Sequence, residues 1–320
     1  MKRLLLLAAL GAMTMQSVAA PLSHQDVGAD PALLVHVDAD ALRSTTVGKA
    51  VLADPDVQTK LAAIQAMFSF DFRTQLHGFT IYTTMGHSDD PVLIIYADFE
   101  PDRLITLAKA FPGFRTDTNG DHTIYNWVDE KKKSVDGTAR VYASLASRRL
   151  MFGKTEPALL AALDVIDGKS PAFSGSKLLL EPAPGELVVA QGRALKFSMD
   201  DNNPSAAIFQ ASKSVRVQLG EAGDNVAAKV SFEAKDEDSA NQISAMVNGL
   251  LALLRFQKDN PDLLKLANGI NVRQDGVAVI LSLSAPSADI IQLLKKGAAD
   301  QHRKEEQQHL DDTNAPATKT

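Results

Sequence analysis

Three residues near the start of the chain have the types and spacing that chemistry could use. His36, Asp38 and Asp40 alternate within and just after an apolar stretch at residues 33–37. Residues two apart in an extended strand point to the same side, so the imidazole and the carboxylates should lie in one line. Such a line could hold a metal ion or supply an acid–base pair to a hydrolase. The alternative is a polar sheet face without a chemical role.

An aromatic pair is the second candidate. Tyr125 and Trp127 lie in a stretch at residues 122–128 that is typical of a strand, with Asn126 between them. Alternation places both rings on one side, where they could contact a ligand or a partner surface. Large aromatic side chains also stabilise sheets by cross-strand packing, which is the ordinary explanation for such a pair.

Motifs for other chemistry are incomplete. The segment Asp117–Asp121 resembles a calcium-binding loop, but its glycine is the fourth residue instead of the sixth, and Val128 stands where the loop needs glutamate. We therefore predict a turn there. The chain has no H-E-x-x-H, no G-x-S-x-G, no phosphate-binding loop and no cysteine. We predict no catalytic residue, no metal site and no cofactor.

The first twenty residues predict export. Lys2 and Arg3 precede an apolar run at residues 4–10, and small residues follow at positions 17–20. This is the layout of a secretory signal peptide, which would be cleaved near Ala19 or Ala20. Pro21 disfavours the later cut. The apolar run is shorter than the roughly 20 residues that a membrane-spanning helix needs. The mature protein is expected in the periplasm or outside the cell.

Composition narrows the function classes. Removal of Lys2 and Arg3 leaves 31 basic and 39 acidic side chains, a net charge of −8. The longest basic run, Lys131–Lys133, is flanked by acidic residues. An acidic chain of this kind disfavours nucleic acids and anionic membranes as partners. We expect no stable membrane insertion after cleavage. About 300 residues with 45% hydrophobic content can bury two cores without disulfides.

The apolar patterns alternate between hairpins and helices, which predicts an α+β fold with mostly antiparallel sheets and helices packed on one face. Leu34-Val35 and Leu187-Val188 match at a shift of 153 residues, and similar elements follow each pair. We therefore predict two tandem α+β domains. Their expected limits are 1–20 for the signal peptide, 21–172 for the first domain, 173–185 for a linker, 186–297 for the second domain and 298–320 for a polar, disordered tail.

These features favour an exported soluble protein with a non-enzymatic binding or interaction function. Its partner would be a protein or a small molecule, bound most readily in a groove between the two domains. The alternative is a hydrolase or a metal-dependent enzyme that uses scattered residues near His36 and Asp38. A purely structural spacer is a third possibility.

Overall fold

The computed structural model describes residues 22–85, 87–134, 137–174, 186–193, 204–256 and 261–314. Its strands all belong to one antiparallel sheet. They are β1 (Pro31–Asp38), β2 (Leu76–Thr84), β3 (His87–Ala97), β4 (Arg115–Asn119), β5 (His122–Ser134), β6 (Gly137–Ala146), β7 (Arg149–Gly153), β8 (Glu186–Arg193), β9 (Ser212–Ala222), β10 (Asn225–Ala234), β11 (Asn271–Asp275) and β12 (Ala278–Pro286).

Helices connect these strands. They are the 3-10 helix η1 (His24–Asp26) and the α-helices α1 (Ala39–Ser44), α2 (Thr46–Leu52), α3 (Pro55–Phe68), α4 (Pro101–Ala108), α5 (Glu156–Ile166), α6 (Pro204–Ala211), α7 (Glu237–Phe256), α8 (Pro261–Gly269) and α9 (Ser287–Asn314). The antiparallel sheet and its helices confirm the predicted α+β class.

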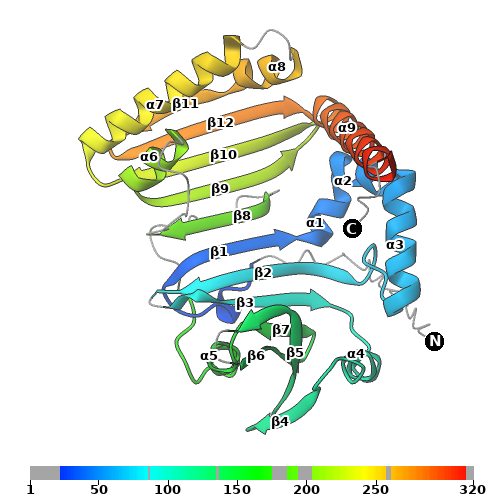
Figure 1. Ribbon diagram of the computed structural model, residues 1–320. Coiled ribbons are helices and arrows are strands. Elements are labelled where there is room, and N and C mark those ends of the chain that lie inside the picture. The colour runs from blue at the N-terminus through cyan, green and yellow to red at the C-terminus, as the bar shows by residue number, and fades with distance from the viewer. Residues whose placement is uncertain are drawn as a thin grey trace, which may run out of the picture.

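The sheet is continuous across the two halves of the sequence, in the order β11-β12-β10-β9-β8-β1-β2-β3-β7-β6-β5-β4 (Figure 1). Its centre is the antiparallel pair β1–β8, in which His36 lies directly opposite Val189. These two positions are also equivalent under the 153-residue shift. Outward from this pair, β2 and β3 correspond to β9 and β10, and the hairpin β6–β7 corresponds to β11–β12. The strands of the two halves therefore follow the same order outward from the central pair.

The two halves bury their cores on opposite sides of the sheet. Leu34 packs with α5 in the first core. Leu34 is paired with Gln191, and Gln191 with Arg216, so these three side chains lie on the same side of the sheet because cross-strand neighbours share a face. Val215 alternates with Arg216 and packs instead beneath α7. We call the two sides the α5 face and the α7 face. The buried residues of the first core include Leu34, Ile94, Met151, Leu159 and Leu163, and those of the second include Val215, Phe232, Ile243, Val247 and Val279.

Local sequence explains where the helices begin and end. Asp54 caps α3 by accepting hydrogen bonds from the backbone N–H groups of Asp56 and Val57, and Pro55 occupies the first turn. The same helix ends at Ser69, which has a left-handed φ of 48°. Thr155 caps α5 through the backbone N–H of Ala158. Both helices have a proline in the first turn, which is a sequence signal for a helix start.

Two parts of the sheet differ from the sequence prediction. Residues 115–119 form β4, an exposed edge strand, where we predict only a turn around Gly120. The apolar stretch at residues 140–152 has the pattern of a single strand, but it is divided between β6 and β7 by a turn in which Ser147 has a φ of 56°. The turn has no glycine or proline, so the sequence carries no strong signal for it.

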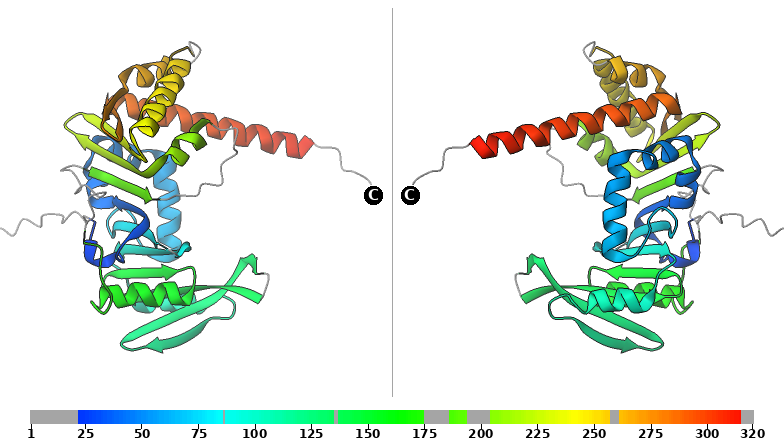
Figure 2. Two further views of the ribbon diagram at one scale, coloured as in Figure 1. Left: turned by 90° about the vertical axis from the view of Figure 1, so that its left-hand side faces the viewer. Right: turned by 90° about the vertical axis from the view of Figure 1, so that its right-hand side faces the viewer.

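The C-terminal helix is long. α9 runs from Ser287 to Asn314, well past residue 298, where a polar tail is expected, and residues 315–320 lie outside the described part. With the sheet seen from its edge, α9 and the β4–β5 hairpin project to the same side (Figure 2). None of the helices in the described part of the chain is long and apolar enough to cross a membrane. The predicted signal peptide at residues 1–20 also lies outside the described residues.

The junction between α1 and α2 depends on the absence of a side chain at Gly48. A Cβ there would lie 1.9 Å from the backbone oxygen of Leu42. We expect Gly48→Ala to lower the free energy of unfolding by about 1–3 kcal/mol, because the backbone must move to relieve the overlap. Urea denaturation measures this loss. Gly297→Ala is the matched control, since Gly297 is helical and its Cβ position is open. The control should be neutral or stabilising, and equal effects at both positions would contradict this explanation.

Candidate functional site

His36 is enclosed within the first half of the sheet. Its side chain lies on the α5 face and is almost completely buried, at 3% exposure. The ring nitrogen Nδ1 is 2.9 Å from Oγ1 of Thr80, and the ring meets Tyr96 edge-on at 6.4 Å. Burial raises the pKa of Tyr96, with a further contribution from Asp26. These contacts give His36 a role in packing.

Asp38 has a capping role. The residue is buried, and its Oδ1 accepts a hydrogen bond of 2.8 Å from the backbone N–H of Ala41 in α1. An aspartate at this position satisfies a backbone donor that the first turn of the helix leaves free. His36 and Asp38 do share one face, but each is engaged with its own neighbour.

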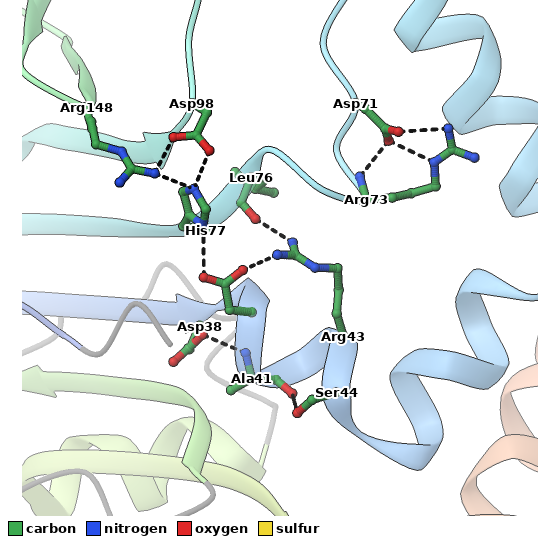
Figure 3. Close-up of polar contacts among 11 residues, drawn as sticks. Asp38, Ala41, Arg43, Ser44, Asp71, Arg73, Leu76, His77, Asp98 and Arg148 are labelled. Carbon is green, nitrogen blue, oxygen red and sulfur yellow. Dashed lines mark hydrogen bonds and ion pairs between the residues drawn. The ribbon is translucent and has the colours of Figure 1, made fainter. Parts of the chain in front are cut away.

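Asp40 belongs to a cluster of charged side chains that the sequence does not predict. Its Oδ2 lies 2.9 Å from Nδ1 of His77, and its other oxygen forms an ion pair with Arg43. The second ring nitrogen of His77 lies 3.2 Å from Oδ2 of Asp98 and 2.9 Å from Nη2 of Arg148. Asp98 and Arg148 form an ion pair with each other. Figure 3 shows His77 at the centre of these contacts.

This cluster links elements that are distant in sequence. Asp40 lies in α1, His77 in β2, Asp98 just after β3, and Arg148 in the turn before β7. Partial burial raises the pKa of Asp98, but the hydrogen bond from His77 and the charge of Arg148 outweigh it and lower that pKa overall. The stabilisation from Asp98 is therefore present above the unfolded-state pKa of about 3.9 and is lost as the pH falls through the lower folded value.

The cluster has the geometry of a structural ion-pair network. Both ring nitrogens of His77 face carboxylates, so neither is aimed at a nucleophilic hydroxyl as a general base would be. Within the described residues, no group of three or more His, Asp or Glu side chains is arranged to hold a metal ion.

Removal of the histidine should destabilise the fold. We expect His77→Ala to lower the free energy of unfolding by about 1–3 kcal/mol at pH 7, because the Asp40 carboxylate, only 5% exposed, loses one of its two partners. Asp98→Asn should cost less than about 1 kcal/mol, since Asp98 is half exposed. Urea denaturation of both variants tests this order, and a larger loss for Asp98→Asn would contradict it.

Tyr125 and Trp127 line an aromatic pocket. Trp127 stacks on Phe111 with ring centroids 5.2 Å apart, and it meets Phe152 edge-on at 6.4 Å. Tyr125 stacks on Phe114 at 6.3 Å. The two side chains share a face, as alternation along β5 predicts. With α4 and the end of α3 they enclose a pocket of about 250 Å³.

The walls of the aromatic pocket come from two helices, α3 and α4, and from the three strands β5, β6 and β7. Leu104, Leu107 and Phe111 recur at helical spacing along and just beyond α4, and they face Leu150 and Phe152 of β7. The strand residues of the pocket belong to the α7 face. Phe152 lies in one cross-strand row with Val35, and Val35 points to the side opposite Leu34, which lies on the α5 face. The aromatic pocket thus lies within the first half, on the side of the sheet away from α5.

The mouth of the aromatic pocket reaches solvent. Phe68 at the end of α3 is 40% exposed, and Phe111 is 47% exposed. Among the described residues, every side chain that lines the pocket is hydrophobic or aromatic, and Tyr125 contributes the only hydroxyl. Exposed apolar surface around a concave site is typical of a binding site and unusual for an ordinary monomer surface. The sequence indicates Tyr125 and Trp127 as candidates but not the other residues that line the pocket. The apolar residues spaced along one side of α4 are the feature of the sequence that could have indicated them.

Comparison with known proteins identifies no family. No family model matches the chain, and no curated protein matches it. Among solved structures, crystal form III of a protein named TP0453 has a TM-score of 0.48 and 9% identity, covering 88% of this chain and all of that one. Crystal form IV has a TM-score of 0.45 at 8% identity, with coverage of 87% and 97%. Crystal form I has a TM-score of 0.43 at 8% identity, with coverage of 87% and 98%. Similarity at this level assigns no residue a function.

Proposed function

We propose that this protein is a non-enzymatic binding protein and that the aromatic pocket receives the apolar end of a small amphiphilic molecule. The observation that carries the proposal is the pocket itself, whose walls are apolar and whose mouth is formed by two partly exposed phenylalanines. Burial of apolar ligand surface there would provide the driving force for binding.

The size and chemistry of the pocket define the ligand class. A volume of about 250 Å³ lies below the roughly 300–1,000 Å³ of most small-molecule sites, so the pocket fits part of a ligand. The described part of the chain places no charged side chain in its lining, and a charged group inside would lose its hydration without compensation. The apolar chain therefore enters, while the polar head group stays at the mouth.

Calorimetric titration with decanoate and 1-decanol tests this function. Both ligands should bind saturably and with affinities within a few-fold of each other, because their apolar ends are alike and the pocket does not contact the head group. Absence of saturable binding by both ligands would contradict the proposal. Binding of decanoate alone would also contradict it, since the head group would then decide affinity.

The enzymatic alternative gains no support from the described geometry. His36 is packed against Thr80 and Tyr96, and Asp38 caps α1. Neither side chain is directed at a shared ligand position, as a metal site or an acid–base pair would require.

We also propose that the protein acts after export. The support is the arrangement of basic, apolar and small residues at positions 1–20. Mass spectrometry of the protein recovered from separated cell fractions tests this proposal. The expected product begins at Ala20 or Pro21 and is found outside the cytoplasm, whereas a cytoplasmic protein that retains Lys2 and Arg3 would contradict export.

A further inference from the structure

A buried arginine in the second half of the sheet lacks hydrogen-bond partners. Arg216 in β9 lies on the α5 face, and its side chain is only 5% exposed. All three guanidinium nitrogens are buried, and none has a hydrogen-bond partner among the described residues. A guanidinium carries five N–H donors, and burying them unsatisfied is costly.

The carboxylate of Glu186 forms an ion pair with Arg216 but does not satisfy its N–H groups. Oε1 of Glu186 lies 3.8 Å from Nη2 of Arg216, about 1 Å beyond the usual distance of a charge-assisted hydrogen bond. Burial lowers the pKa of Arg216, and the charge of Glu186 opposes that shift. Gln191, directly across the sheet from Arg216, has a buried side-chain oxygen with no hydrogen-bond partner in the described part of the chain.

We propose that Arg216 is the receptor for the carboxylate group of a small monocarboxylate ligand. Its planar guanidinium can donate two parallel hydrogen bonds to the two oxygens of a carboxylate. This site is separate from the aromatic pocket, which lies in the first half of the chain and on the other face of the sheet.

The neighbouring charge favours a monoanion. Glu186 places one negative charge beside the single positive charge of Arg216, so the pair has no excess positive charge to hold a second negative charge on a ligand. A dianionic phosphate would meet about twice the repulsion from Glu186 that a singly charged carboxylate meets. We therefore expect propionate to bind at least about tenfold more tightly than inorganic phosphate, a ratio that one charged hydrogen bond can supply.

The side-chain Nε–H resonance of Arg216 gives a direct readout in the unmodified protein. The signal can be assigned by its disappearance in Arg216→Lys. Titration of ¹⁵N-labelled protein with propionate should move this resonance along a saturable curve, while phosphate moves it only at much higher concentration. A linear response without saturation, or equal affinity for phosphate, would overturn the proposal.

Arg273 provides a matched control for non-specific attraction of anions. Arg273 lies in β11, in the cross-strand row that runs from Arg216 to Ser231, Ile280 and Arg273, so it is on the same face of the sheet. Its side chain, however, is 65% exposed. Arg216→Gln should abolish the rise in melting temperature caused by propionate, and Arg273→Gln should preserve it. An equal loss in both variants would show that propionate acts through general surface charge and would overturn the site. The wild-type titration decides the question if Arg216→Gln does not fold.

Discussion

Ile243→Ala is expected to lower the free energy of unfolding by about 2–5 kcal/mol, the range measured for removing a fully buried branched side chain. Ile243 lies in α7 with no exposed surface, at the centre of the second core. We also expect the free energy of unfolding of the first half to fall by the same amount in this variant. Trp127, the only tryptophan, reports that half by fluorescence, and far-ultraviolet circular dichroism reports the whole chain.

The contacts between the halves are the reason for this coupling. β1 and β8 share a ladder of hydrogen bonds, and the Glu221 carboxylate of β9 accepts hydrogen bonds from the backbone N–H groups of Thr46 and Val47 in α2. Leu253→Ala is the control, since Leu253 lies in the same helix but is 65% exposed, and it should change stability by less than about 0.5 kcal/mol. A Trp127 transition that stays unshifted in Ile243→Ala would show that the halves unfold independently.

Leu107→Asp should lower the affinity for decanoate at least tenfold. Leu107 faces the aromatic pocket from α4, and the variant would place a carboxylate against apolar walls. Excluding water from that carboxylate costs more than about 1.4 kcal/mol, which corresponds to a tenfold change in affinity. Calorimetric titration with decanoate measures the change.

The neighbouring residue supplies the matched control. Thr106 is exposed, lies on the same helix and does not line the aromatic pocket. Thr106→Asp adds the same charge to α4, so its affinity for decanoate should stay within about twofold of the wild type. Equal losses in both variants would mean that charge on the helix, and not the lining of the pocket, controls binding.

Local patterns predicted much of the fold. Alternation of apolar residues gave most strands, and Asp-Pro, Glu-Pro and Asn-Pro pairs marked helix starts such as those of α3, α4 and α8. The shared face of Tyr125 and Trp127 follows from the same alternation. These features depend on residues within a few positions of one another, which a sequence displays directly.

Contacts between distant residues could not be predicted in the same way. His77 meets Asp40 across 37 positions and Arg148 across 71, and nothing in the spacing indicates either contact. The opposite placement of α5 and α7 depends on the register of β8 between β1 and β9. A shift of one residue in either pairing would reverse the faces, so the sequence pattern alone does not choose between them.

The most direct test of the aromatic pocket uses the position of a quenching atom along the ligand chain. Bromine quenches tryptophan fluorescence at short range, and Trp127 is the only tryptophan in the protein. We expect 10-bromodecanoate, which carries bromine at its apolar end, to quench Trp127 strongly and saturably. 2-Bromodecanoate should quench it weakly at the same occupancy, with unmodified decanoate as the control for binding itself. Equal quenching by the two brominated ligands, or stronger quenching by 2-bromodecanoate, would contradict an apolar chain inserted beside Trp127.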